Sequence, residues 1–167
     1  MSESLAALFR RITAGVYVVG VAHAEQRNAF TAAWLIQASF DPLLLALSIN
    51  PTHTSYGLLK AGGGFTVNVL QENDLAIARH FGTQSGRAAD KLAGVVWYPG
   101  RSTGAPILSQ ALAYFECQVT GSLPAGDHEI VLGRVLDGRL VVPAAAPLTY
   151  EQTGDMDGSS QLYPRGF

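Results

Sequence analysis

ALAYFECQVTGSLPAGDHEIVLGRVLDGRLVV, residues 111–142, is the stretch of the sequence that most clearly indicates the fold. Apolar and polar side chains alternate over residues 111–122, which predicts a strand with one buried face. The turn-forming sequence PAGD then leads into a second predicted strand over residues 128–136. Asp137-Gly138 predicts a hairpin into a short third strand. Strands at such close spacing indicate an antiparallel sheet.

The chain before this stretch contains further short strands, joined by turns and brief helices. The predicted strands cover residues 16–22, 30–40, 43–49 and 65–70, and the predicted helices cover residues 4–14, 54–59 and 74–81. Gln26-Arg27-Asn28 predicts a turn, and residues 83–105 are expected to be mainly loop with a short strand at 95–98. The run 43–49 is apolar throughout, as in a strand covered on both faces. Short strands with only brief helices favour a closed or half-closed antiparallel barrel over a sheet of βαβ units.

The composition sets limits on the class of protein. A chain of 167 residues is long enough for one core, so we expect a single domain, with a leading helix (1–15), a barrel (16–143) and an extended C-terminal arm (144–167). Hydrophobic residues make up 48% of the chain and charged residues 14%, which predicts that some apolar surface is buried in a subunit interface. The net charge of −2 argues against a nucleic-acid partner.

The sequence contains no pattern typical of secretion or of a membrane-spanning segment, which predicts a cytoplasmic protein without a membrane partner. Cys117 is the single cysteine, which fits a reducing compartment, and its place on the apolar side of a predicted strand indicates a small buried hydrophobe. The four histidines lack the spacing of metal ligands, so no metal site is expected. A P-loop, a Gly-x-Gly-x-x-Gly fingerprint and a nucleophile-elbow serine are also absent from the sequence.

Three blocks of sequence together resemble one known family. They are TAAWLIQASFDP at residues 31–42, GFTVNVL at 64–70 followed by a predicted helix ending in His80-Phe81-Gly82, and the segment 104–133 with its Gly126-Asp127-His128 turn. Their order resembles the flavin reductase-like, FMN-binding split β-barrel family. The first block, which has Trp34 and Gln37 in this sequence, is most similar to the flavin reductase module fused to some flavodiiron proteins. The resemblance implies a mainly β fold, an antiparallel, Greek-key-like split barrel with a few short peripheral α-helices.

The resemblance also implies an activity. Members of the family transfer a hydride from NADH or NADPH to FMN, with FAD as an alternative flavin, and they form homodimers with the flavin at the subunit interface. A monooxygenase or another electron-acceptor protein is the implied partner. The alternatives are a non-enzymatic FMN-binding electron carrier of the same fold and a barrel that has lost its cofactor.

The residue types in the matching positions fit flavin binding. Small side chains at 31–33 allow a flat ring to approach the backbone, and hydroxyl groups at a helix start suit a phosphate. The expected cofactor-binding residues are Thr31, Ala32, Ala33, Trp34, Gln37, Ala38, Ser39, Ser48, Ile49, Thr52, Thr54, Ser55, Phe81 and Gly82. The resemblance also gives His128 a positioning role in catalysis.

Each of these interpretations has a structural alternative. Trp34 is equally well explained as a core or interface aromatic, and His128 as a strand-end residue that only hydrogen-bonds Asp127. Phe81-Gly82 also reads as a helix end, and Lys91 as a solvated charge. Many family members have Asn-Ser in place of Ala33-Trp34 and a second proline in place of Leu43, which leaves the environment of the ring open.

Overall fold

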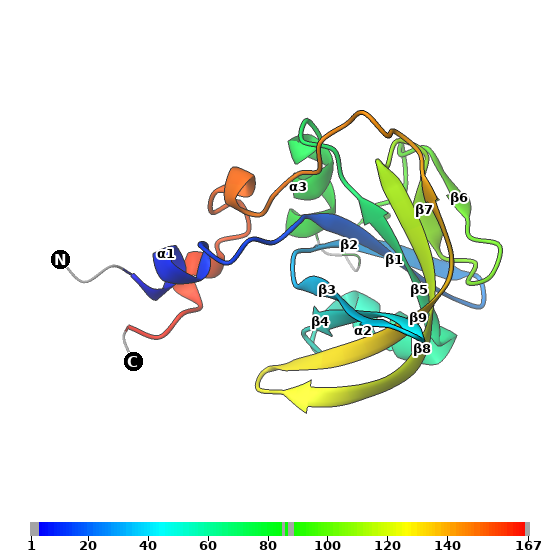
Figure 1. Ribbon diagram of the computed structural model, residues 1–167, viewed down its shortest axis with the longest axis horizontal. Coiled ribbons are helices and arrows are strands. Elements are labelled where there is room, and N and C mark those ends of the chain that lie inside the picture. Colours follow the sequence, from blue (N-terminus) through cyan, green and yellow to red (C-terminus); the bar gives the residue numbers. More distant parts are fainter. Residues whose placement is uncertain (1–3, 85, 87–88, 166–167) are drawn as a thin grey trace.

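The computed structural model describes residues 4–84, 86 and 89–165, and its main element is a seven-stranded antiparallel sheet (Figure 1). The strands lie in the order β2-β1-β5-β8-β9-β4-β3. They are β1 (Tyr17–His23), β2 (Gln26–Ala32), β3 (Leu35–Phe40), β4 (Leu43–Ile49), β5 (Gly64–Val69), β8 (Ala113–Ala125) and β9 (His128–Leu140). The edge strands β2 and β3 follow each other in the chain, so the strongly curved sheet forms a split barrel. The predicted fold class is therefore confirmed.

Smaller elements surround this sheet. They are the helices α1 (Leu5–Phe9), α2 (Thr54–Gly62) and α3 (Leu75–Thr83), and a two-stranded sheet of β6 (Trp97–Pro99) and β7 (Pro106–Leu108). Strand β7 was not predicted, because its three residues are too few to show a period. Among the described residues, no helix is long and apolar enough to cross a membrane.

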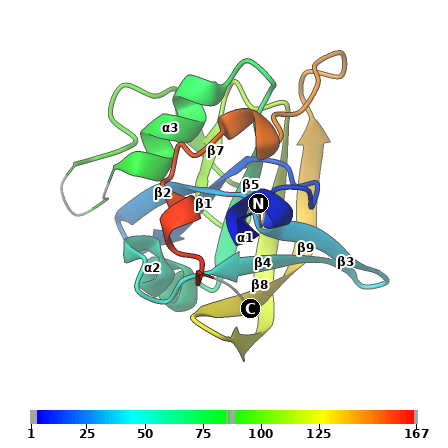
Figure 2. The same ribbon diagram turned by 90° about the vertical axis from the view of Figure 1, so that its left-hand side faces the viewer.

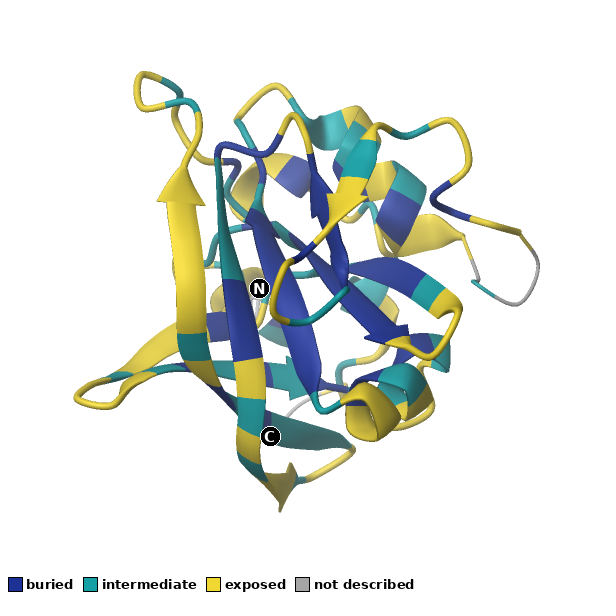
Figure 3. Ribbon diagram, turned by 90° about the vertical axis from the view of Figure 1, so that its right-hand side faces the viewer, coloured by how far each residue is buried: buried dark blue, intermediate teal, exposed yellow. Residues whose placement is uncertain are grey.

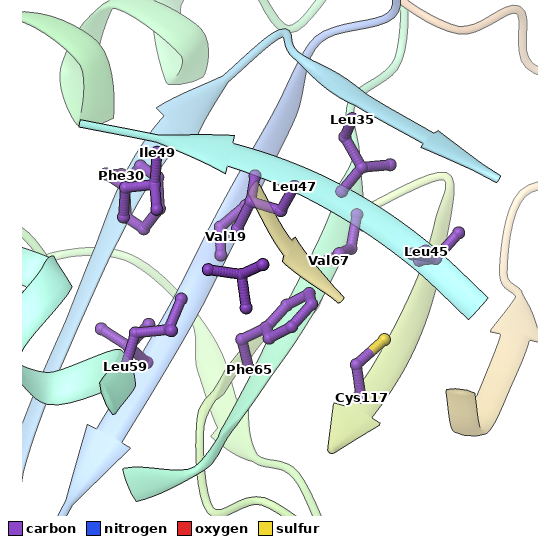
Figure 4. Close-up of a cluster of buried hydrophobic side chains, with 12 residues drawn as sticks. Val19, Phe30, Leu35, Leu45, Leu47, Ile49, Leu59, Phe65, Val67 and Cys117 are labelled. Carbon is purple, nitrogen blue, oxygen red and sulfur yellow. The ribbon is translucent and has the colours of Figure 1, made fainter. Parts of the chain in front are cut away.

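The interior of the barrel is filled by alternating side chains from the curved sheet (Figure 4). Leu47 and Phe65 are fully buried there, as is the free thiol of Cys117. Helix α2 closes this core with Leu59. Strand β4 alternates between buried and partly exposed residues, so the expectation that both its faces are covered is wrong for the single chain.

A second core lies on the outer face of β1 and β2, under helix α3 (Figure 2). Phe81 and Ala78 of α3 pack there against Val18 and Ala29 of the sheet. Leu148, from the segment that follows the barrel, also belongs to this cluster. The second core fixes α3 beside β2, the strand that carries Thr31 and Ala32, and so positions one wall of the candidate site.

Two turn predictions are wrong because tertiary pairing overrides the local sequence. Asp137-Gly138 lies inside β9, where it pairs with Phe115 and Glu116 across a bulge, and so it forms no hairpin. Gln26-Arg27-Asn28 belongs to β2, and the turn lies two residues earlier, where Ala24 has a positive φ of 50°. The predicted strand 30–40 is interrupted at Ala33-Trp34, which separates β2 from β3.

The two ends of the chain lie together, away from the barrel (Figure 1). Helix α1 ends at Phe9, earlier than predicted, and Phe9 contacts Tyr163 with 5.4 Å between ring centroids. Arg10 forms an ion pair of 2.8 Å with Asp155. The C-terminal segment contains 3-10 turns at Glu151–Thr153 and Ser159–Gln161, so it is not the fully extended arm that we expected.

Candidate functional site

A large hollow of ≈ 810 Å³ lies at the start of helix α2, beside β2 and the loop after α3. Thr54, the first residue of α2, lines it together with Arg27 and Asn28 of β2 and Lys91 of the loop. His53 caps this helix start, because its Nδ1 accepts a hydrogen bond of 3.2 Å from the Ser55 N–H, and the positive end of the helix dipole lies here, which suits an anion. The volume of the hollow lies within the range that is usual for small-molecule sites.

Lys91 places a positive charge next to this helix start. The residue is only 1% exposed, and among the described residues its Nζ donates a hydrogen bond, of 3.2 Å, to the carbonyl oxygen of Phe81. Burial lowers the pKa of Lys91 to about 8, and burial together with the charge of Lys91 lowers the pKa of His53. An ammonium group carries three donors, so an anion in the hollow would supply the interactions that burial removes. The expectation of a solvated Lys91 is therefore wrong.

The hydroxyl residues of the 52–55 turn differ in how far they are free to bind a ligand. Ser55 is buried, and its Oγ accepts a hydrogen bond of 3.0 Å from Asn28 Nδ2. Thr52 Oγ1 donates to Asn50 Oδ1 at 2.8 Å, which uses this hydroxyl within the turn. Thr54 lies on the hollow. Of the three predicted phosphate contacts, Thr54 is thus the one that faces an open space.

Strand β2 brings small side chains close to helix α3. The Thr31 hydroxyl donates to the carbonyl oxygen of Ala78 at 2.7 Å. At Gly82, an added Cβ would lie 3.3 Å from the Thr31 Cβ, so glycine permits this close packing. Thr31, Ala33 and Gly82 line a small cavity of ≈ 70 Å³, which Met156 of the C-terminal segment closes. The C-terminal segment thus reaches the predicted flavin strand.

The predicted catalytic histidine meets Trp34. The ring centroids of Trp34 and His128 lie 4.9 Å apart, and the rings are inclined by 50°. His128 Nδ1 lies 2.8 Å from Asp127 Oδ1, and this contact lowers the pKa of Asp127. The Ser48 N–H donates to the carbonyl oxygen of Trp34 at 2.9 Å. Trp34, Ser48 and His128, which were all predicted site residues, therefore form one cluster.

The remaining predicted site residues lie apart from these groups. Ile49 and Phe81 are 3% and 1% exposed and belong to the two cores, and Ala32 packs partly buried against the barrel core. Gln37 and Ser39 lie on the edge strand β3, and Ala38 sits between them at a bulge. None of these three residues lines the hollow, and Figure 2 shows that β3 extends away from α2.

The arrangement fits a flavin nucleotide. Strand β2 rises about 3.3 Å per residue, so Asn28 at the hollow and Ala33 at the Trp34 cluster are roughly 17 Å apart. This separation suits a ligand with a phosphate at one end and a flat ring at the other. The buried ammonium and the helix start provide for the phosphate, and the small residues of β2 leave room for the ring.

The chain is similar to several known proteins. Residues 9–159 match the model of the flavin reductase like domain. The chain is 35% identical over 131 residues to diflavin flavoprotein A 1 of Synechocystis sp., a match that covers 78% of this chain and 23% of that protein. It is 33% identical over 141 residues to the high molecular weight rubredoxin of Moorella thermoacetica, covering 83% of this chain and 61% of that protein.

The solved structure of the NADH:FAD oxidoreductase SgcE6 from Streptomyces globisporus matches with a TM-score of 0.83. It is 28% identical, and the match covers 89% of this chain and 88% of that one. The chain spans less than a quarter of the length of the diflavin flavoprotein. The family model covers most of the chain and confirms the resemblance found in the sequence: the protein belongs to the flavin reductase like domain family.

Proposed function

We propose that this protein is an NAD(P)H-dependent flavin reductase that transfers a hydride from a nicotinamide nucleotide to FMN. The observation that carries the proposal is the buried Lys91 ammonium at the α2 hollow, which β2 also lines with Arg27 and Asn28. Membership of the family supports a flavin oxidoreductase. FMN is chosen over FAD because the Lys91 site offers one concentrated charge for a terminal phosphate.

In this proposal each part of the site has one task. Lys91 and the start of α2 at Thr54 bind the phosphate, and Thr31–Ala33 allow the ring to lie against β2. When bound, FMN supplies the two-electron acceptor for the hydride. Trp34 and His128 orient the reacting rings, since hydride transfer requires close stacking and no protein nucleophile. Ser48 supports this cluster through its hydrogen bond to the Trp34 backbone.

We also propose a homodimer with the flavin at the subunit interface. Strands β3 and β4 and the β8–β9 hairpin expose large apolar side chains on the single chain, at Trp34, Ile36, Phe40, Leu43 and Leu123. A contiguous apolar surface of this kind marks an interaction site. A second copy would bury it next to Trp34 and His128. A cytoplasmic location fits the free thiol of Cys117.

The physiological acceptor is proposed to be an oxygenase or another electron-acceptor protein. One solved neighbour, 28% identical with a TM-score of 0.75, is described as the flavin reductase component of a bacterial two-component tryptophan halogenase. The diflavin flavoproteins carry the matching region within a much longer chain. Both cases place a module of this family beside a partner that uses electrons.

The test is anaerobic stopped-flow mixing of the FMN-loaded protein with NADH and, separately, with NADPH. A reductase bleaches the flavin absorbance within seconds with at least one of them. Flavin that binds tightly but stays oxidised with both nucleotides would instead indicate an electron carrier. A protein that takes up no FMN at saturating concentration would refute both readings.

A further inference from the structure

A second hollow, of ≈ 470 Å³, is lined by residues of β6 and its surroundings. Strands β6 and β7 lie on the right-hand side of Figure 1, the side that Figure 3 turns towards the viewer. Strand β6, the loop that follows it and the far ends of β8 and β9 form the walls of the hollow. Tyr114 pairs with Arg139 in this part of the sheet, whereas His128 lies at the opposite end of β9. Arg139 follows His128 by eleven positions, which correspond to roughly 36 Å along the strand. The hollow is therefore separate from the proposed flavin site.

The walls combine aromatic rings with guanidinium groups. Tyr98 and Tyr114 meet edge to face, with 6.5 Å between ring centroids and 89° between ring planes. The pKa of Tyr98 is raised, mainly by burial and to a smaller extent by the neighbouring Tyr114. Its hydroxyl is therefore a hydrogen-bond donor at neutral pH. Arg101 and Arg139 line the same hollow, and neither guanidinium forms an ion pair within the described part of the chain.

A buried carboxylate holds the loop wall in place. Glu116 is 1% exposed and accepts hydrogen bonds from the backbone N–H groups of residues 101, 102 and 103, each at 3.0 Å. The Thr103 hydroxyl adds a fourth, at 2.9 Å. These donors bind both carboxylate oxygens and so fix the loop to β8, while no ion pair joins Glu116 to either arginine among the described residues. The site is thus pre-organised, and its lining contains two arginines and two acids, Glu116 and Asp137.

We propose that this hollow binds a small planar aromatic anion. A guanidinium fork matches a carboxylate or phosphate in two parallel hydrogen bonds, and a flat ring packs well against tyrosine rings. Buried Ile107 supplies an apolar floor. The volume suits a single ring with one anionic substituent. The proposal does not depend on reductase activity.

The experiment is isothermal titration calorimetry of the full chain, saturated with FMN, against matched probes. Benzoate and phenyl phosphate should bind, and their relative affinities identify the preferred anion. Cyclohexanecarboxylate lacks the flat ring and benzamide lacks the charge, so each should bind at least tenfold more weakly. Equal binding of benzoate and cyclohexanecarboxylate, or no binding of either aromatic anion at millimolar concentration, would overturn the proposal.

Three variants locate the bound probe. Arg101→Gln and Arg139→Gln should each weaken binding of the aromatic anion by about tenfold or more, because each removes a charge-assisted hydrogen bond. Arg134→Gln is the matched control, since Arg134 is exposed on the same strand but outside the hollow, and it should bind like the unaltered protein. Unchanged binding in both hollow variants, or displacement of the probe by FMN, would contradict this location.

Discussion

At the scale of single residues, the proposed phosphate site depends on Lys91. A buried ammonium with one acceptor among the described residues is costly unless a ligand compensates it, and burial lowers its pKa to about 8. The nearby start of α2 offers the same preference for an anion. The cost of burying Lys91 in the empty protein is therefore an argument for a bound phosphate in the working protein.

Replacing Lys91 tests this role directly. Lys91→Met should weaken FMN binding by about tenfold or more, because a charge-assisted hydrogen bond to the phosphate is lost. The same variant should unfold at an equal or higher urea concentration without FMN, since an uncompensated buried charge has been removed. Lys60→Met, at the chain's other lysine, is the control and should leave fluorescence-detected FMN affinity unchanged. Reduced stability with unaltered FMN affinity would show that Lys91 is structural.

The lowered pKa of Lys91 also predicts a pH dependence. Its ammonium form binds phosphate, so FMN affinity should fall as pH rises above about 8, by up to tenfold per pH unit. Below about pH 6 the phosphate loses its second charge and affinity should fall again. The free energy of unfolding of the FMN-free protein should rise as the pH increases from 8 to 10.5. In this range Lys91 binds more protons in the unfolded chain than in the folded protein. FMN titrations across pH 5–10 measure how the affinity for FMN changes with pH. An affinity that stays constant at alkaline pH would contradict the predicted fall.

His128 is the second residue with a defined expectation. His128→Ala should lower the rate of flavin reduction by roughly tenfold to a hundredfold while FMN stays bound, because the ring that contacts Trp34 no longer positions the nicotinamide. Stopped-flow reduction and equilibrium FMN binding separate the two effects. His23→Ala, at the exposed end of β1, is the control. Loss of flavin with a normal rate in added FMN would assign His128 to binding.

At the scale of elements, strand ends and bulges position the functional groups. The bulge between Glu116 and Cys117 lets Asp137-Gly138 stay within β9, and Glu116 points to the loop that joins β6 to β7. At Gly100 an added Cβ would lie 2.3 Å from the Glu116 carboxylate, so the loop closes tightly around it. The loop and the sheet thus form one unit.

Removing the Glu116 carboxylate should therefore destabilise the protein. Glu116→Ala leaves three backbone N–H groups without their acceptor, and at about 1 kcal/mol or more for each group the free energy of unfolding should fall by about 3 kcal/mol or more. Urea unfolding measures the change. Glu25→Ala, in the exposed β1–β2 turn, should change stability by less than about 0.5 kcal/mol. Equal stability of the two variants would show that the loop finds other partners.

At the scale of the whole molecule, two surfaces remain to be explained by assembly. One is the apolar face of β3 and β4, where Ile36 is 66% and Phe40 is 89% exposed. The other is the pair of chain ends, where α1 lies against the C-terminal segment and away from the barrel (Figure 1). The low charge content of the sequence agrees with a chain that buries part of this surface against a second copy.

The dimer proposal predicts the effect of a charge on the apolar face. Ile36→Lys should convert the protein to a monomer, because a lysine at a desolvated interface is unfavourable, and light scattering after size-exclusion chromatography measures the mass. Val96→Lys is the control, since Val96 is 73% exposed on a different loop. A native protein that already elutes as a monomer would refute the homodimer.

The sequence by itself determined the strand pattern and the family. Alternation over residues 111–122 corresponds to β8, and the blocks around Trp34 and His128 indicated a flavin reductase-like barrel, since both signals are local in the chain. The sequence also placed Thr31, Thr54 and His128 among the expected site residues.

Only the tertiary structure decided what each of these groups faces: Thr54 lies on the α2 hollow, Thr31 lines the small cavity beside α3, and His128 lies against Trp34. Burial of Lys91 and of Ser55, and the continuity of β9 through Asp137-Gly138, depend on contacts between distant segments, which no local period records. A charged side chain in a loop has the same sequence signature whether it is solvated or buried. The physical reason is that burial and electrostatic environment are properties of packing, and packing is set by the whole curved sheet and the elements that cover it.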